Sequence, residues 1–261
     1  MNLKKYLFIS GLAVSIQGFA KAHHSGTLSS INLGARYSSI LEKRGVVLYR
    51  DFQVDPVAGI FFFDDRLEFL GDSLGYHDFI FEDKIRLRGR LVSVSDKPLF
   101  PAYQAIQNGS PSRNDTAEAS ISAEFFFPGY NENYVSELDV TYSKDISQHH
   151  GNYLEVQGKL KLFSVYLDSL KLPLEPNFVA TLGTGDRSHN QYFYGPDDEA
   201  LGINNISYGF WIAFPTEADR AFPIIQVTRF SVFGDHRKAQ FADGRNEGFL
   251  ISFIATYGFL D

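Results

Sequence analysis

The sequence contains no cysteine and only one methionine and one tryptophan. Without cysteine, the chain has no disulfide framework, no thiol nucleophile and no acceptor for a lipid anchor. After residue 22 it also lacks any apolar run of the roughly 20 residues that a transmembrane helix requires. If the mature chain enters a membrane, it must therefore do so as a closed β-barrel, because only helices and closed barrels satisfy every backbone hydrogen bond in lipid.

The chain is also poor in basic residues, with 24 Lys and Arg against 31 Asp and Glu. Residues 1–22 resemble a secretory signal peptide, with Lys4 and Lys5 before an apolar run and Ala20-Lys21-Ala22 as the cleavage pattern. We expect cleavage after Ala22. Removing Lys4, Lys5 and Lys21 leaves 21 basic residues against 31 acidic ones, a net charge of −10. This balance argues against nucleic acid as a partner.

Aromatic residues and glycine are abundant, with Phe 25, Tyr 14 and Gly 22, yet the mean hydropathy is only −0.15. A membrane barrel has this composition because apolar residues that face lipid alternate with polar residues that face the lumen. Four segments, 84–91, 118–125, 137–143 and 154–162, alternate in this way. Their charged faces carry Lys84, Arg86, Arg88, Arg90, Glu118, Glu124, Glu137, Asp139, Glu155, Lys159 and Lys161.

The pattern predicts an all-β protein, a transmembrane antiparallel up-and-down barrel of about ten strands. The expected strands are 46–63, 66–81, 84–95, 116–127, 134–145, 152–167, 172–184, 205–214, 221–234 and 248–260. Twelve strands are the alternative, with 28–39 as an additional strand and 46–63 split in two. Residues 23–45 are accordingly an amino-terminal extension or an additional strand, and the barrel domain spans 46–261.

The connections between these strands sort by length. The long polar connections are 96–115, 145–151, 185–204 and 235–247, and the short ones are 82–83, 127–133, 168–171 and 215–220. Long loops on one rim and short turns on the other are typical of outer-membrane barrels, whose termini lie in the periplasm. A soluble barrel such as a lipocalin would turn its apolar face inward instead. We therefore predict export to the outer membrane of a Gram-negative cell, with outer-membrane lipid as the surrounding partner.

The charged residues of the four segments predict a ladder of ion pairs inside the lumen. Such a ladder can line a narrow polar conduit, or it can fill the interior of a barrel that is only just wide enough for its own side chains. We favour filling, because the opposite charges balance and leave no dominant field to select an ion.

Three other features were considered as sites. His149 and His150, with Asp145 nearby, are interpreted as part of a solvated loop, because adjacent residues on a turn rarely reach one metal ion. The segment 186–189 contains an acid, a hydroxyl and an imidazole, but side chains this close along one segment rarely form a triad. We predict no catalytic residue, no metal and no cofactor, and hence no enzyme. Aromatic triplets at 61–63, 125–127 and 192–194 are interpreted as interfacial girdles.

The segments Tyr49–Pro56, Phe61–Phe63, Asp145–Gly151, Leu174–Asn177 and Asn190–Gly195 make the chain similar to the MltA-interacting protein (MipA/OmpV) family. The resemblance covers about residues 45–261, and the connection 96–115 is longer than is usual in relatives. It implies an outer-membrane barrel. Some members are described as scaffolds that join a lytic transglycosylase to a penicillin-binding synthase, and others as osmotic-response proteins or adhesins.

The resemblance therefore implies a non-enzymatic scaffold that links murein hydrolysis and synthesis enzymes. Such binding would fall on two of the short periplasmic turns, through Gly129, Tyr130, Asn131, Glu217 and Asp219. A narrow channel for small solutes and a surface adhesin that uses the long outer loops are the alternatives. The sequence leaves the oligomeric state open.

Overall fold

The structure is a computed structural model of residues 1–261. It describes residues 28–38, 41–43, 46–49, 53–63, 65–81, 84–94, 116–128, 135–167, 172–194, 202–214, 221–233 and 247–258. The expected cleavage site at Ala22 and the turn residues Gly129, Tyr130, Asn131, Glu217 and Asp219 lie outside these ranges.

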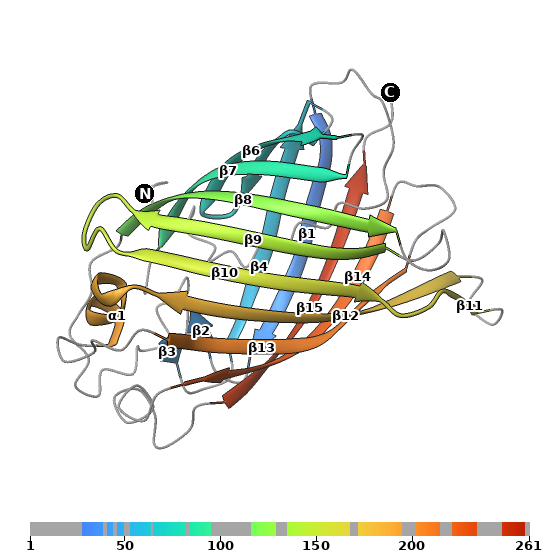
Figure 1. The fold of residues 1–261 in the computed structure, drawn as a ribbon. Helices are drawn as coiled ribbons and strands as arrows, with labels where there is room; N and C mark the ends of the chain where they lie inside the picture. Colours follow the sequence, from blue (N-terminus) through green and yellow to red (C-terminus); the bar gives the residue numbers. More distant parts are fainter. Residues whose placement is uncertain are drawn as a thin grey trace, which may run out of the picture.

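Twelve antiparallel strands of the described residues form a closed ring (Figure 1). They are β1 (Leu28–Ser38), β4 (Gln53–Phe62), β5 (Leu67–Leu70), β6 (Ser73–Ile80), β7 (Ile85–Val94), β8 (Thr116–Pro128), β9 (Val135–Asp145), β10 (Asn152–Lys161), β12 (Leu172–Gly185), β13 (Gly202–Ala213), β14 (Ala221–Val232) and β15 (Glu247–Gly258). The short strand β11 (Val165–Leu167) continues the pairing of β10 with β12, and β2 (Leu41–Lys43) and β3 (Val46–Tyr49) form a separate hairpin between β1 and β4.

Each strand of the ring pairs with its neighbours in the chain, and β1 closes the ring by pairing with β15. This first-to-last pairing runs from Ser30 opposite Gly258 to Ser38 opposite Leu250. The all-β, antiparallel, up-and-down barrel predicted from the alternation pattern is thereby confirmed. In a closed ring every strand is paired on both sides, so the sheet has no open edge. A β-sheet can lie in lipid only when it is closed in this way.

The strand number is the alternative count of twelve, but the two additional strands arise differently from the expectation. Leu28–Ser38 is a wall strand, as the alternative had it. The second additional strand comes from 66–81, which divides into β5 and β6, whereas 46–63 supplies only β4 to the wall. Gly71 makes this division possible, because the two-residue turn between Leu70 and Ser73 holds it at a φ of 57°, which glycine adopts without strain.

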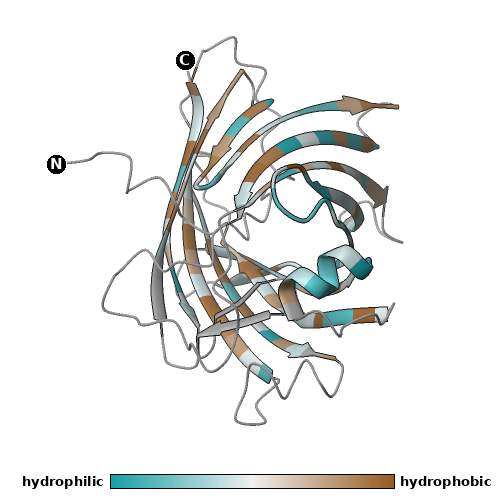
Figure 2. Cartoon of the chain, turned by 90° about the vertical axis from the view of Figure 1, so that its left-hand side faces the viewer, coloured by the Kyte–Doolittle hydropathy of each residue, from teal (hydrophilic) through white to brown (hydrophobic). Residues whose placement is uncertain are grey.

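The barrel turns apolar side chains outward and polar side chains inward. Figure 2 shows the resulting alternation of hydrophobic and hydrophilic bands along the strands. On β15 the exposed side chains are Phe249, Ile251, Phe253 and Tyr257, whereas Ser252 between them is buried. A water-soluble barrel has the opposite polarity, so the wall is of the membrane-embedded type. No helix in the described part of the chain is long and apolar enough to cross a bilayer.

The connections lie on two rims. The strands β1, β5, β7, β9, β12 and β14 end at one rim, which carries the connections 39–52, 71–72, 95–115, 146–151, 186–201 and 233–246. The strands β4, β6, β8, β10, β13 and β15 run the other way and end at the opposite rim, where every connection is shorter than 95–115, 186–201 and 233–246. We call these the long-loop rim and the short-turn rim.

Candidate functional site

The lumen contains a built ion pair between β7 and β8. The Arg86 guanidinium is fully buried and pairs with Glu124, to which its Nε donates a hydrogen bond of 2.5 Å. The Cζ atom of Arg86 lies over the neighbouring rings of Phe79 and Phe126, 5.6 and 5.5 Å from their centroids. The charge of Arg86 is therefore neutralised by one carboxylate and also makes cation–π contacts with two rings.

The next two arginines of β7 share a different carboxylate. Arg90 Nε donates to Glu68 Oε1 at 2.6 Å, and Arg88 Nε lies 3.5 Å from the same oxygen. Glu68 belongs to β5 and its side chain is fully buried. Glu68 is not among the residues predicted from the sequence, because a single strand over 66–81 would lack the turn that places β5 within reach of β7.

A second group of ion pairs joins β9, β10 and β12. Lys159 Nζ lies 2.6 Å from Glu137 Oε1, and Lys161 Nζ lies 2.7 Å from Glu175 Oε1. Ser164 Oγ also donates to Glu175, at 3.1 Å. Glu175 was not among the charged residues predicted to face the lumen. It nevertheless follows the alternation of inward and outward side chains on β12.

The remaining predicted ladder residues have varied positions. Glu118 is buried directly opposite Asp145 of β9, and Asp139 is opposite Glu124 and accepts a hydrogen bond of 3.1 Å from Thr141. Glu155 is half-buried on β10. Lys84 is the exception: it lies in the turn before β7 and is exposed, because the strand begins one residue later than expected.

The charge is concentrated on one side of the lumen. The inward side chains of β5 to β10 include most of the charged residues, whereas β12 to β15 and β1 contribute mainly amides, hydroxyls and apolar groups. On this less charged side, which still includes buried Arg36 and Glu175, Ser252 donates to Gln226 at 2.9 Å. At its border with the charged side, Gln157 of β10 donates to Thr181 of β12 at 3.0 Å. The lumen is thus asymmetric, a property that sequence alternation alone does not reveal.

Most of these inward side chains are inaccessible. Arg86 is 1% exposed, Arg88 4% and Glu124 5%, values expected for a packed interior and not for the wall of a wide aqueous channel. These inward side chains are therefore closely packed.

A second cluster lies at the long-loop rim and is organised by Asp145. The Oδ1 atom of Asp145 accepts hydrogen bonds from four successive backbone N–H groups of the β9–β10 connection, those of residues 147 to 150. Its Oδ2 atom accepts from Thr116 Oγ1 and lies 3.5 Å from His149 Nε2. One carboxylate thus orders the entire loop.

The helix α1 (Arg187–Tyr194) begins at the same rim, immediately after β12. Asp186 caps it: Oδ1 accepts from the backbone N–H of His189 at 2.9 Å, and Oδ2 accepts from Asn152 Nδ2 at 2.5 Å. Burial alone would raise the pKa of Asp186, but the hydrogen bonds from His189 and Asn152 outweigh it and hold the pKa below its ordinary value. Figure 2, which faces this rim, shows α1 across the mouth of the barrel.

Aromatic and imidazole rings join α1 to the β9–β10 connection. The rings of His149 and Tyr192 stack with centroids 4.4 Å apart, and His189 lies 4.5 Å from Phe193 and 4.9 Å from Tyr153. Beneath them Asn204 Nδ2 donates to Asn190 Oδ1 at 3.0 Å, with both side chains fully buried. We call these residues, together with Asp145 and Asp186, the rim cluster.

Glycines make room for the rim cluster. A Cβ atom at Gly151 would collide with the backbone of His189, and one at Gly185 would collide with the His189 ring and the Asn190 amide. A Cβ atom at Gly183 would collide with the Tyr153 hydroxyl. The first turn of α1 is therefore seated directly against β10 and β12.

Two sequence interpretations are corrected here. The connection 146–151 is solvated as expected, with residues 146–148 and His150 exposed, but the His149 side chain is enclosed, because its ring packs on α1. Tyr192 and Phe193 are not girdle residues, because they belong to α1 and pack on histidines. In the segment 186–189, Asp186 has a structural role as the cap of α1. The described residues hold no group of three or more potential ligands suited to a metal ion.

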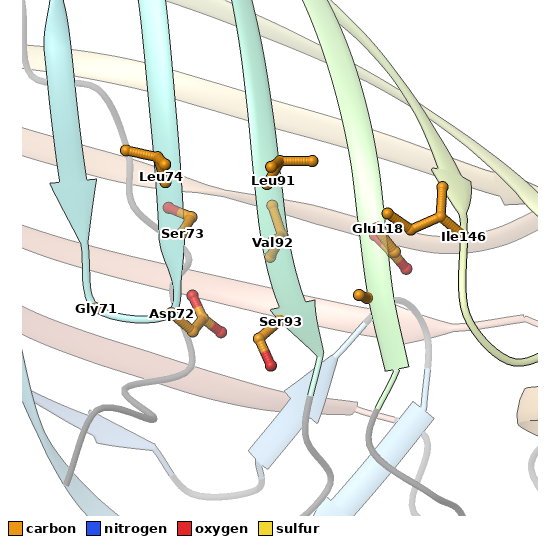
Figure 3. A pocket seen from close by; sticks show the side chains of 10 residues that line it. Gly71, Asp72, Ser73, Leu74, Leu91, Val92, Ser93, Glu118 and Ile146 are labelled. Atoms are coloured by element: carbon orange, nitrogen blue, oxygen red, sulfur yellow. The ribbon is translucent and has the colours of Figure 1, made fainter. Parts of the chain in front are cut away.

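A shallow groove of about 380 Å³ also opens near the long-loop rim, beside the Gly71–Asp72 turn (Figure 3). Leu74 and Leu91 lie side by side at one end of it, and Glu118 and Ile146 lie at the other. Leu74, Leu91 and Ile146 are exposed, so the groove is continuous with the apolar outer wall.

Comparisons with known proteins find two solved structures of low similarity. The chain is similar to the transport unit of the autotransporter AIDA-I from Escherichia coli, with 11% identity, a TM-score of 0.39 and coverage of 98% of this chain and 96% of that one. It is also similar to Ail, the attachment invasion locus protein of Yersinia pestis, with 9% identity, a TM-score of 0.19 and coverage of 90% and 99%. No protein-family model matches the chain, and the search of curated proteins returned no match. The fold assignment rests on the strand pairing described above.

Proposed function

We propose that this chain is a non-enzymatic outer-membrane barrel that acts through protein contacts at its rims and not through transport. The single observation that carries this proposal is the filled lumen: buried Arg86 and Lys161 and half-buried Lys159 are each matched with a carboxylate across the interior. Paired charges that bury one another contribute to the stability of a barrel and leave little path for a solute.

The outer-membrane location is supported by the apolar outer wall, the division of long and short connections between two rims, and the signal-peptide pattern at residues 1–22. Its specific form, a scaffold for murein hydrolase and synthase enzymes, is supported by the resemblance to the MipA/OmpV family. In outer-membrane barrels the short turns face the periplasm, so periplasmic enzymes would bind at the short-turn rim. The connections 129–134 and 215–220 join strands that end at this rim.

The scaffold is tested by crosslinking in intact envelopes, with photo-reactive residues placed at Tyr130 or Glu217. We expect adducts with a cell-wall hydrolase or synthase, and their loss when 129–134 and 215–220 are scrambled together. Scrambling 234–246 on the long-loop rim is the matched control and should leave the adducts intact. No cell-wall enzyme among the adducts, or adducts that survive the first scramble, would contradict the scaffold.

Transport is tested on the same purified barrel. We expect no steady single-channel conductance in a planar bilayer. Steady conductance whose ion selectivity changes in Arg88→Gln would replace the interaction proposal with a channel.

Surface adhesion is the second candidate, and the ordered rim cluster favours it. The loop 146–151 and α1 are held by Asp145, Asp186 and stacked rings, so they present a pre-organised surface beside the barrel mouth. Whole cells that carry the protein would then bind a host or abiotic surface, and replacing 146–151 by a glycine-serine loop would abolish the binding.

A further inference from the structure

The arginine row of β7 is not uniformly neutralised. Arg86 has its own carboxylate, Glu124, whereas Arg88 and Arg90 share Glu68. Of the two, Arg90 makes the close contact, at 2.6 Å, and Arg88 remains 3.5 Å away. Arg88 is thus a buried cation that shares one carboxylate with Arg90 and makes the longer of the two contacts with it.

Several polar atoms around Arg88 have no hydrogen-bond partner in the described part of the chain. They are Nε and Nη2 of Arg88, Nη2 of Arg90, Nδ1 of His77 and Oε2 of Glu68. The Arg88 side chain is 3% exposed, and His77 and Glu68 are fully enclosed. Buried guanidinium donors are almost always satisfied in folded proteins, so such a group of atoms indicates that a polar species completes the site.

The strand register gives this site its chemistry. Arg88 stands directly opposite His77 of β6 on one side and Ser122 of β8 on the other, and Thr141 of β9 follows Ser122. Across these four strands, the level of Arg88 holds one guanidinium, one imidazole and two hydroxyls, and it holds no carboxylate. Glu124 lies one level away, opposite Arg86, and Glu68 lies one level away on the other side, opposite Gly75 and next to Arg90.

We propose that this level of the lumen is a binding site for a small phosphate-type oxyanion. A guanidinium with free Nε and Nη2 groups matches two oxygens of a tetrahedral oxyanion, and Arg90 Nη2 and the Ser122 hydroxyl supply further donors. The anion would add a negative charge beside Arg88, whose contact with Glu68 is the longest carboxylate contact of the β7 arginines, and would satisfy the buried donors.

The unpartnered oxygen of Glu68 favours a protonated oxyanion. Hydrogen phosphate carries an O–H group that can donate to Oε2, whereas sulfate at neutral pH has no proton and would place an oxygen against the carboxylate. The site therefore prefers phosphate, or a phosphate monoester small enough to enter, over sulfate. This inference does not depend on the proposed scaffold role, because it concerns a ligand inside the barrel and not a partner at the rim.

The test uses the full mature barrel folded in detergent. Its unfolding temperature is followed by the fluorescence of Trp211 at constant ionic strength, while chloride is replaced by phosphate, methyl phosphate or sulfate. We expect a saturable rise with phosphate, a smaller one with sulfate, and none with chloride alone, since a ligand that binds only the folded state stabilises it. A rise with methyl phosphate would extend the site to phosphate monoesters, and its absence would restrict it to the free ion.

Substitutions locate the effect. Arg88→Gln should abolish the phosphate-dependent rise, Ser122→Ala should weaken it, and Glu68→Gln should reduce the preference for phosphate over sulfate. Arg229→Gln, on the outer wall, is the control and should retain the full rise. If Arg88→Gln fails to fold, ³¹P line broadening on the wild-type and Ser122→Ala barrels provides the measurement. Equal unfolding temperatures in phosphate and chloride with no broadening, or a full rise in Arg88→Gln, would overturn the proposal and leave internal water as the occupant.

Discussion

Oε1 of Glu68 accepts a hydrogen bond of 2.6 Å from Nε of Arg90 and so joins β5 to β7 across the intervening strand β6. The residue of β6 between them is Gly75, which is opposite Glu68 on one side and Arg90 on the other. The two side chains meet because Gly75 places nothing between them.

Adding a methyl group at this point should break the contact. In Gly75→Ala the new Cβ would lie 2.6 Å from Glu68 Oε1 and 3.0 Å from Arg90 Cγ, so we expect a loss of about 1–3 kcal/mol in unfolding free energy. Gly89→Ala is the control, because a Cβ there meets no atom within 4 Å. Urea unfolding, followed by heat-modifiable gel migration, measures both. Equal stability of the two variants would contradict the close approach.

Removing Glu124 should be costly because Arg86 would remain buried without its carboxylate. We expect Glu124→Gln to lower the unfolding free energy by about 3–5 kcal/mol. The exposed outer-wall pair of Arg229 with Glu247 is the comparison, and Glu247→Gln should change the stability little. A double variant, Arg86→Met with Glu124→Leu, should recover most of the loss. If Glu124→Gln and Glu247→Gln lower the unfolding free energy by the same amount, the ion pair of Arg86 with Glu124 does not stabilise the barrel.

The outer wall is tested by a charge placed in the middle of a strand. Ile121 of β8 is 60% exposed, so Ile121→Arg would be harmless in water, but in a bilayer it should cost about 2–4 kcal/mol. Ile146 is exposed to a similar degree, 51%, but lies beyond the end of β9, so Ile146→Arg should cost much less. Unfolding in lipid vesicles compares them. Similar costs would argue against a lipid-facing surface at Ile121.

The seat of α1 depends on a glycine. Gly185→Ala would push against the His189 ring and the Asn190 amide, so we expect the helix to leave the barrel mouth and become accessible to protease. Gly202→Ala, at the start of β13 on the same rim, meets no atom within 4 Å and should leave the protease pattern unchanged. Cleavage between residues 187 and 194 is the readout, and protection in Gly185→Ala would show that the seat tolerates a side chain.

The stabilisation of α1 by its Asp186 cap should be lost at low pH. Because the pKa of Asp186 is lower in the folded chain than in the unfolded one, its contribution is fully present well above the unfolded value of about 3.9 and is lost as pH falls through the lower folded value. We expect hydrogen exchange in 187–194 to be constant near neutrality and to accelerate in this acid range. Asp186→Ala should show protection weakened by about 0.5–2 kcal/mol near neutrality, and its difference from the wild type should shrink as pH falls through this acid range. The same acid dependence in the variant would assign it to another group.

The sequence predicted the wall well because alternation is a local property. Charges at every second position of 84–91 can share a face only in a strand, and that face must avoid lipid in a membrane barrel. The pattern therefore predicted that Arg86, Arg88 and Arg90 face the lumen. It predicted that Leu87 and Leu91, on the other face of the same strand, point outward. It missed the turn at Gly71, because Leu70 and Leu74 on either side continue an apolar pattern that a single long strand would also show.

The amino-acid sequence by itself determined that the chain is a β-barrel with a polar interior, since the hydrophobic period and the lack of any long apolar run leave no other membrane-compatible fold. Only the tertiary structure decided which charges meet. Glu68 reaches Arg90 across Gly75, and His149 stacks on Tyr192 from a different loop. These contacts depend on register and ring closure, which bring together residues far apart in the chain, and no local pattern encodes them.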